Sequence, residues 1–274
     1  MIENILENFA SHEKWNFGVL YFLLLTLVLY FVFFTGSPTH KKYKSVLFVI
    51  GLLVYFLALG SPLNLLGRIQ FRFHIVQMVM IIFTSAPLLV WGMKDAVVHR
   101  VSSFQALRSL LGRLTNPVWT LIVFHVLFLV YHVPSVFDTV RINEYVHSFY
   151  LLAMFLSALL FWFGMFPSNE VQHQVTNKNR RRLYVSFIVL FIPLTGILLF
   201  STHSLYSIYT DNELILSSLG LCLPLEQLDV PIIEEDMLEA LSPFPPKREQ
   251  LVGGMILLVS QVIAVIFLPF LRKS

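Results

Sequence analysis

Residues 60–67 read GSPLNLLG and residues 72–78 read RFHIVQM, so a polar turn leads directly into an apolar segment. The turn is rich in Gly, Ser, Pro and Asn, the residue types that start and end helices. His74 and Met78 stand four residues apart, a spacing that places both side chains on one face of a helix. We therefore expect this stretch to present two metal-binding side chains near the start of an apolar helix.

The composition of the whole chain is that of a helical membrane protein. Of its 274 residues, 57% are hydrophobic and 13% are charged, which is about half the charged fraction of soluble domains. Most of its apolar runs are about 17–22 residues long, enough to cross a bilayer at about 1.5 Å per residue. The seven runs are 17–34, 45–60, 72–92, 117–133, 145–166, 183–201 and 251–270. The sequence thus predicts an all-α fold, with residues 1–274 forming a single membrane domain, a bundle of seven transmembrane helices.

The distribution of Lys and Arg predicts the orientation of this bundle. Thirteen of these residues fall in segments on one side of the predicted spans and six on the other. Because basic residues stay in the cytoplasm, the N-terminus is predicted outside and the C-terminus cytoplasmic. All the acidic residues except Asp95 and Glu170 then lie outside. Since topology accounts for the basic residues, the net charge of +3 gives no indication of nucleic-acid binding.

Two connections between the predicted spans differ from simple loops. Residues 93–116 alternate apolar positions with Arg100, Arg108 and Arg113, a pattern that predicts a basic amphipathic helix on the cytoplasmic face of the lipid bilayer. Residues 202–250 are expected to form a long acidic extracellular loop.

Four histidines lie at the outer ends of predicted spans. His74 opens the third span, His132 closes the fourth, His147 opens the fifth and His203 follows the sixth. If their helices are neighbours, these imidazoles converge at one depth. Imidazole is a common ligand for copper, and the thioether of Met78 adds a preference for Cu(I). The pattern therefore predicts a metal site at the outer face, formed by some of these five residues.

The same residues also have structural interpretations, which stay open at this point. A His at a membrane interface can hydrogen-bond to water or headgroups, and Met78 can simply fill the core. For Gln77 an interhelical hydrogen bond is enough. His125, below His132 and near mid-membrane, raises the alternative of a redox protein that binds haem b. It has no His partner at its own depth, so haem is not expected.

Signatures of common enzyme sites are missing from the sequence. It contains no Gly-x-Ser-x-Gly, no His-Glu-x-x-His, no phosphate-binding glycine loop and no Cys-x-x-Cys-His. Cys222 is the only cysteine, which excludes an intramolecular disulfide. We expect a protein that is not an enzyme.

Four segments give the chain a family resemblance. They are GSPLNLLG at 60–67, HIVQM at 74–78 with APLL at 86–89, YHVPSVFD at 131–138 with His147 after it, and EQLVGGM at 249–255. In order and in placement on the predicted spans, the chain resembles the CtaG family of cytochrome c oxidase (caa3-type) assembly factors of Gram-positive bacteria. The resemblance extends over nearly the whole length.

The resemblance implies a role in the maturation of a haem–copper oxidase in the bacterial plasma membrane. Copper is then the metal to be delivered, and oxidase subunits are the partners. The polar residues of the predicted spans that match positions of the family motifs are His74, Gln77, His132 and His147. A scaffold for oxidase assembly that binds no metal is an alternative, and the oligomeric state is not predicted.

Two positions depart from the family pattern. Met78 stands where many relatives have a second His, a change that keeps a soft ligand or marks the loss of metal binding. Glu249 and Gln250 stand where the family has Asp-Gln before its Gly-Gly pair.

Overall fold

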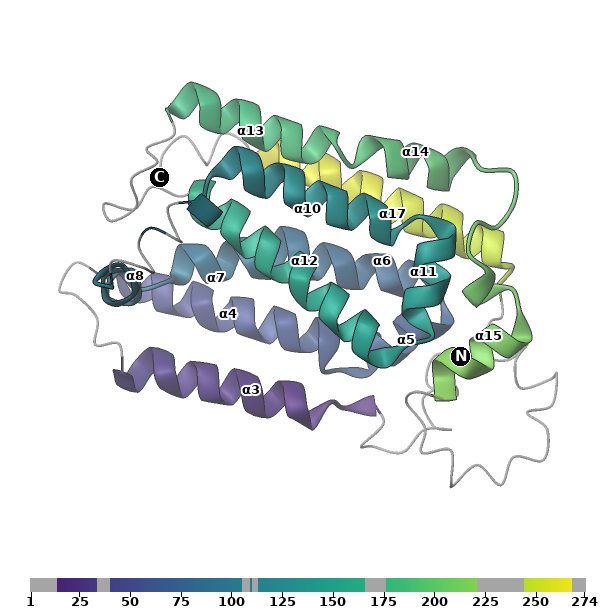
Figure 1. The fold of residues 1–274 in the computed structure, drawn as a ribbon, viewed down its shortest axis with the longest axis horizontal. Helices are drawn as coiled ribbons and strands as arrows, with labels where there is room; N and C mark the ends of the chain where they lie inside the picture. Colours follow the sequence, from purple (N-terminus) through teal and green to yellow (C-terminus); the bar gives the residue numbers. More distant parts are fainter. Residues whose placement is uncertain are drawn as a thin grey trace.

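The computed structural model describes residues 14–33, 40–104, 109, 113–165, 176–220 and 244–267, and all regular structure in these ranges is helical. The long helices run side by side along one axis of the molecule (Figure 1). Three short helices gather at one end of them, namely α5 (Pro62–Ile69), α11 (Pro134–Arg141) and α15 (Asn212–Gly220). We call this the capped end of the bundle.

Each predicted span corresponds to a helix or to consecutive helices. These elements are α3 (Phe17–Val28) with the π-helical turn η1 (Leu29–Phe33), α4 (Lys42–Leu59), α6 (Phe71–Val79) with η2 (Met80–Ser85) and α7 (Ala86–Gly92), α10 (Pro117–Tyr131), α12 (Glu144–Met165), α13 (Asn177–Val189) with α14 (Ile192–Phe200), and α17 (Pro246–Phe267). Two shorter elements, α8 (Asp95–Ser102) and the 3-10 turn η3 (Ser207–Tyr209), lie in connections. The all-α class predicted from the sequence is confirmed.

The described residues contain five helices that are long and apolar enough to cross a membrane. They are Lys42–Leu59, Phe71–Gly92, Glu144–Met165, Lys178–Phe200 and Pro246–Ile266. A sixth candidate is the pair of α10 and α11, which is bent by 80°, whereas Phe17–Val32 is a shorter apolar helix. Five or six candidate spans are therefore supported by length and composition. The seventh span and the orientation stay predictions.

The two unusual connections are described only in part. α8 lies in the 93–116 connection, and η3, α15 and the start of α17 lie within 202–250. Residues 105–108, 110–112 and 221–243 lie outside the described ranges, as does Cys222. The membrane-surface helix and the extracellular loop therefore stay predictions.

The sixth predicted span is interrupted near Pro193. Proline has no N–H to donate, and α13 ends at Val189, shortly before α14 begins. At this break the N–H of Phe191 donates to the carbonyl of Ile188, at 3.2 Å. The carbonyl of Phe187 is thereby left without its usual helical donor.

His125 supplies a polar partner for that carbonyl. Its Nε2 lies 3.0 Å from the oxygen of Phe187, and its Nδ1 lies 2.9 Å from the oxygen of Leu121. Both ring nitrogens thus lie within hydrogen-bonding distance of a backbone oxygen, and the nitrogen that carries the proton donates to its carbonyl, which gives this histidine a structural role.

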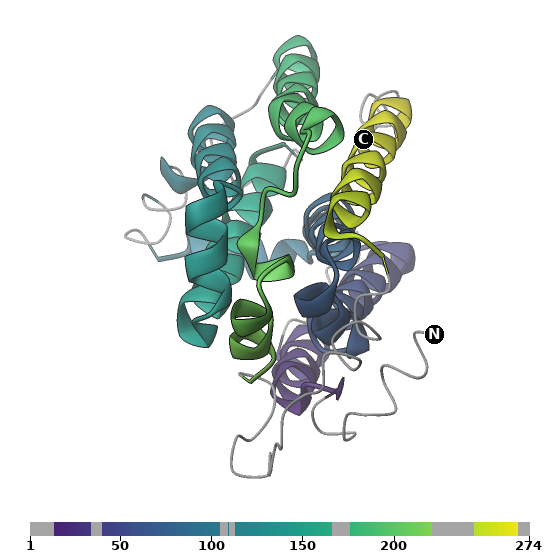
Figure 2. The ribbon, with the colours of Figure 1, turned by 90° about the vertical axis from the view of Figure 1, so that its right-hand side faces the viewer.

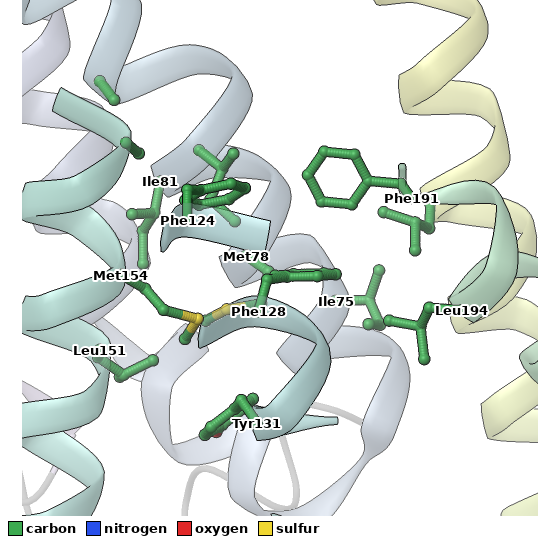
Figure 3. Close-up of a cluster of buried hydrophobic side chains, with 14 of the residues drawn as sticks. Ile75, Met78, Ile81, Phe124, Phe128, Tyr131, Leu151, Met154, Phe191 and Leu194 are labelled. Carbon is green, nitrogen blue, oxygen red and sulfur yellow. The ribbon is translucent and has the colours of Figure 1, made fainter. Parts of the chain in front are cut away.

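Large apolar side chains from several helices form the core. Figure 3 shows Phe124 and Phe128 of α10 against Ile75 and Met78 of α6, with Met154 of α12 beside them. Between membrane helices such contacts stabilise through close packing rather than through release from water. The core therefore fixes the relative positions of the helices that carry the histidines.

α4 and α7 approach each other closely at Gly92, the last residue of α7. A Cβ atom at this position would lie 2.5 Å from the backbone nitrogen of Phe48 and 2.6 Å from the carbonyl oxygen of Lys44. Both are backbone atoms of α4, so they cannot move aside unless the helices separate.

The substitution Gly92→Ala should therefore lower the stability of the folded chain by about 1–3 kcal/mol, because overpacked helices must move apart. Thermal unfolding in detergent would measure this as a lower Tm. Gly196→Ala on α14 is the control, since a Cβ atom there would have no other atom within 4 Å. An unchanged Tm for Gly92→Ala would contradict the close approach of α4 and α7.

Candidate metal centre

The polar turn at residues 60–67 forms α5, a short helix that packs against the start of α6. Ser61 caps it, accepting a hydrogen bond at its Oγ from the N–H of Leu63, with Pro62 in the first turn. Gln70, in an extended conformation, ends α5 and immediately precedes α6. The chain therefore reverses between α4 and the span that begins with α6, and α5, which lies between them, packs against α6.

Gln77 holds this reversal in place. Its Nε2 donates to the carbonyl of Ala58, at 2.7 Å, and to Oδ1 of Asn64, at 2.9 Å. Gly67 lies next to both groups, since a Cβ atom there would be in ordinary van der Waals contact, at 3.4 Å, with Gln77 Oε1 and the backbone nitrogen of His74. Gln77 thus makes the interhelical contact considered from the sequence, and this contact positions His74.

His74 and His132 form the centre of the candidate site. Their ring centroids are 5.8 Å apart, and the His74 side chain is fully buried, with 0% exposure. Among the described residues neither ring nitrogen of His74 forms a hydrogen bond of normal geometry, although the Gln77 side chain is close enough to interact with the ring, and Nε2 of His132 has no partner. Burial of such nitrogens without a partner is costly. Together with Gln77 Oε1 and the Tyr131 hydroxyl, which are also buried and unpaired among the described residues, they are polar atoms that a ligand could satisfy.

A backbone contact sets the tautomer of His132. Its Nδ1 lies 2.8 Å from the carbonyl of Phe128, which can only accept a hydrogen bond. Nδ1 therefore carries the proton, and Nε2 presents a lone pair. Metal-binding histidines usually donate their second ring N–H in this way, which orients the ring.

Aromatic rings surround the His74 imidazole. The ring centroids of Phe137, Tyr131 and Phe71 lie 5.2, 5.6 and 6.0 Å from that of His74. Such an environment excludes water and favours soft, weakly hydrated ions over strongly hydrated ones.

Met78 lies one helical turn after His74 on α6, as the spacing predicts. Its side chain is 2% exposed and belongs to the hydrophobic core. Figure 3 shows it among Phe124, Phe128 and Met154. Met78 thus has a packing role in the core.

His147 joins this region through Arg141 and Tyr131. Its Nε2 lies 3.3 Å from Nη1 of Arg141, and its ring centroid is 6.4 Å from that of Tyr131. Arg141, which ends α11, is 1% exposed and also donates to the carbonyl of Gly67 and, at 3.2 Å, to the hydroxyl of Tyr209. Sequence reasoning counted Arg141 only as one of the outer charges, because nothing in the local pattern indicates its burial.

His203 lies apart from the histidine pair. It is exposed in the turn after α14, where its Nδ1 lies 3.3 Å from the hydroxyl of Thr202. In the part of the chain that the structure describes, no group of three or more His, Cys, Asp or Glu side chains could hold a metal ion. The two buried imidazoles therefore fit a low-coordination ion better than a closed tetrahedral site.

Glu249 and Gln250 connect α17 to its neighbours. Oε2 of Glu249 lies 3.2 Å from Nε of Arg72, which pairs α17 with α6. Gln250 accepts a hydrogen bond from the N–H of Leu205, at 2.9 Å, and donates to the carbonyl of Leu198, at 3.3 Å. Both residues thus have structural contacts, with α6, α14 and the residue that precedes Tyr206.

Residues 205–209, which we call the covering segment, pack over the site. Tyr206 stacks on Phe71 and contacts Phe137, with centroid distances of 4.9 and 4.4 Å, and its hydroxyl donates to the carbonyl of His132, at 3.2 Å. Figure 2 shows the green chain that contains this segment running between the teal helices and the blue helices. Burial raises the pKa of the Tyr206 and Tyr209 phenols, so both stay neutral.

The fold and this site define a helical protein with several candidate membrane spans and a buried pair of histidines beneath a covering segment. The chain belongs to the family described as cytochrome c oxidase caa3 assembly factor, whose model matches residues 19–272. The resemblance inferred from the motifs is thereby confirmed. Comparisons with curated proteins and with solved structures each gave no match.

Family membership indicates association with cytochrome c oxidase during its assembly and favours a non-catalytic role. The apolar helices and the family together fit a bacterial membrane.

Asp138 holds the covering segment in place, since its carboxylate accepts hydrogen bonds from the N–H groups of Ser207 and Ile208, both at 3.0 Å. Asp138→Ala should accelerate hydrogen–deuterium exchange in residues 205–209 by about tenfold or more, because charge-assisted bonds contribute about 1.5–3 kcal/mol. Mass spectrometry of the detergent-purified chain would measure this. Asp95→Ala, at the exposed start of α8, is the control and should leave the segment unchanged. Equal exchange in both variants would show that Asp138 does not hold the segment.

Proposed function

We propose that this protein binds a copper ion at the capped end of its bundle and passes it to a subunit of a caa3-type cytochrome c oxidase. The observation that supports the proposal is the His74–His132 pair, in which Nε2 of His132 and both ring nitrogens of His74 are buried without a geometrically defined hydrogen bond among the described residues. Leaving a buried polar atom unpaired costs about 1–3 kcal/mol, which a bound ion would remove. Family membership supplies the oxidase as recipient.

The ligands favour Cu(I) as the ion that is transferred. Imidazole nitrogens and a thioether sulfur are neutral donors, and the thioether prefers Cu(I). Two such imidazoles, with Met78 as a third ligand, would form an open site from which the ion can leave, whereas four ligands would retain it. His147, linked to the pair through Tyr131, and the exposed His203 are further candidate ligands on the path of transfer.

We further propose that the capped end faces the outside of the bacterial plasma membrane. In this arrangement seven helices span the membrane, the N-terminus is outside and the C-terminus is cytoplasmic. Residues 202–250 are then an extracellular acidic loop, and residues 93–116 are the cytoplasmic amphipathic connection. The basic start of α13, with Lys178 and Arg180–Arg182, lies at the end opposite the capped end (Figure 1), which supports this orientation.

Cysteine labelling tests the orientation. In a Cys222→Ser background, Thr202→Cys at the capped end should react with a membrane-impermeant maleimide in intact cells. Ser103→Cys, after α8, should react only once the membrane is permeabilised. Both positions are exposed, so burial does not explain a difference. The reverse pattern would overturn the proposed orientation.

A Cu(I) titration tests the metal site. The detergent-purified chain, titrated anaerobically against a competing chelator, should bind about one Cu(I). His74→Ala and His132→Ala should each weaken binding by at least about tenfold, because each removes a ligand from a site of low coordination. Met78→Leu keeps the packing volume and measures the contribution of the thioether. His40→Ala, at a half-buried histidine that bonds to Ser45 just before α4, is the matched control and should bind as the unmodified chain does.

The same variants can be followed in cells. His74→Ala, inserted into the membrane at the normal level, should lower oxidase activity. Failure of the unmodified chain to bind Cu(I) would refute the copper site and leave an assembly scaffold that binds no metal. Normal oxidase activity with His74→Ala would remove this residue from the mechanism.

A further inference from the structure

Arg141 carries a buried positive charge whose contacts are all with neutral groups. Among the described residues its guanidinium bonds to the carbonyl of Gly67, the imidazole of His147 and the hydroxyl of Tyr209. Asp138, one turn earlier on α11, instead accepts from the backbone of the covering segment. Charges buried in proteins are normally paired with an opposite charge, but among the described residues no carboxylate forms an ion pair with Arg141.

This charge lies close to the histidine pair. Cζ of Arg141 is 5.5 Å from the centroid of the Phe137 ring, which is itself 5.2 Å from the centroid of His74. The guanidinium therefore lies within about 11 Å of the His74 ring, and the groups between them are apolar or neutral. Arg141 also donates a hydrogen bond to the carbonyl of Gly67, and this glycine lies next to the backbone of His74.

We propose that Arg141 makes the site selective for monovalent over divalent cations. The inference rests on the proposed metal-binding function and specifies the ion that the site accepts. His74, His132 and Met78 are neutral ligands, so they supply no negative charge to offset Arg141. Repulsion from a fixed charge is proportional to the charge of the ion, and a divalent ion therefore loses twice as much binding free energy as a monovalent one.

The size of this preference for monovalent ions can be estimated from the outer limit of the distance between the Arg141 guanidinium and the His74 ring. At about 11 Å and an effective dielectric constant of about 20, one unit charge weakens binding of a monovalent cation about tenfold and of a divalent cation about a hundredfold. Arg141 thus shifts the preference about tenfold toward a monovalent ion. Imidazole alone would favour Cu(II) or Zn(II), which are abundant competitors for histidine sites.

The test compares Ag(I), a monovalent ion without redox chemistry under these conditions, with Zn(II) on the purified full chain. Competition titrations give the ratio of the two binding constants. Arg141→Gln should raise Zn(II) affinity about tenfold more than Ag(I) affinity, because the fixed charge is lost. Arg141→Lys keeps the charge and should keep the ratio. Arg181→Gln removes a charge at the exposed start of α13, opposite the capped end, and is the matched control.

A second variant covers the case in which Arg141→Gln does not fold. Tyr209→Glu keeps Arg141 and introduces a carboxylate at the position of a hydroxyl that it contacts, which neutralises the charge. It should change the Zn(II)/Ag(I) ratio in the same direction. If the unmodified chain binds Ag(I) and neither variant changes the ratio, the role of Arg141 is overturned while the proposed function stands. If the unmodified chain binds neither ion, the proposed function itself fails.

Discussion

The hydrogen bonds from the Gln77 amide to Ala58 and Asn64 hold the capped end in the form that creates the site. They join the end of α4, the short helix α5 and the start of α6, three elements that are consecutive in the sequence, and the span that begins with α6 runs antiparallel to α4. Inside a membrane protein buried amide N–H groups without partners are costly, so the chain adopts the reversal that satisfies the two N–H groups of Gln77. The position of His74 is a consequence of this local constraint.

A second constraint is the free-energy cost of burying polar groups. Some buried polar side chains have hydrogen-bond or ion-pair partners, and others do not. His125 has both nitrogens against backbone carbonyls, and Glu249 is paired with Arg72. His74, by contrast, is fully buried and neither nitrogen forms a hydrogen bond of normal geometry among the described residues, near the buried charge of Arg141. Folded chains retain such costly arrangements chiefly where function requires them. This contrast separates the candidate site from the structural polar contacts around it.

Much of the fold could be predicted because helix formation and membrane insertion depend on local composition. The apolar runs correspond to helices, and the i, i+4 spacing of His74 and Met78 gives the register found in α6. The break near Pro193 also follows from local sequence, because proline has no N–H and interrupts the helical hydrogen bonds. The fold does not bring all the predicted site residues together. His74 and His132 are buried next to each other, whereas His203 is exposed.

The sequence by itself determined the helical class, the family motifs and the residue types available to a metal. It did so because periodicity, composition and spacing act over a few residues. The tertiary structure alone decided that His74 faces His132, that Met78 also packs in the core, and that Arg141 is buried beside them. These contacts join helices far apart in the chain, and their geometry depends on how whole helices pack, which no local pattern encodes.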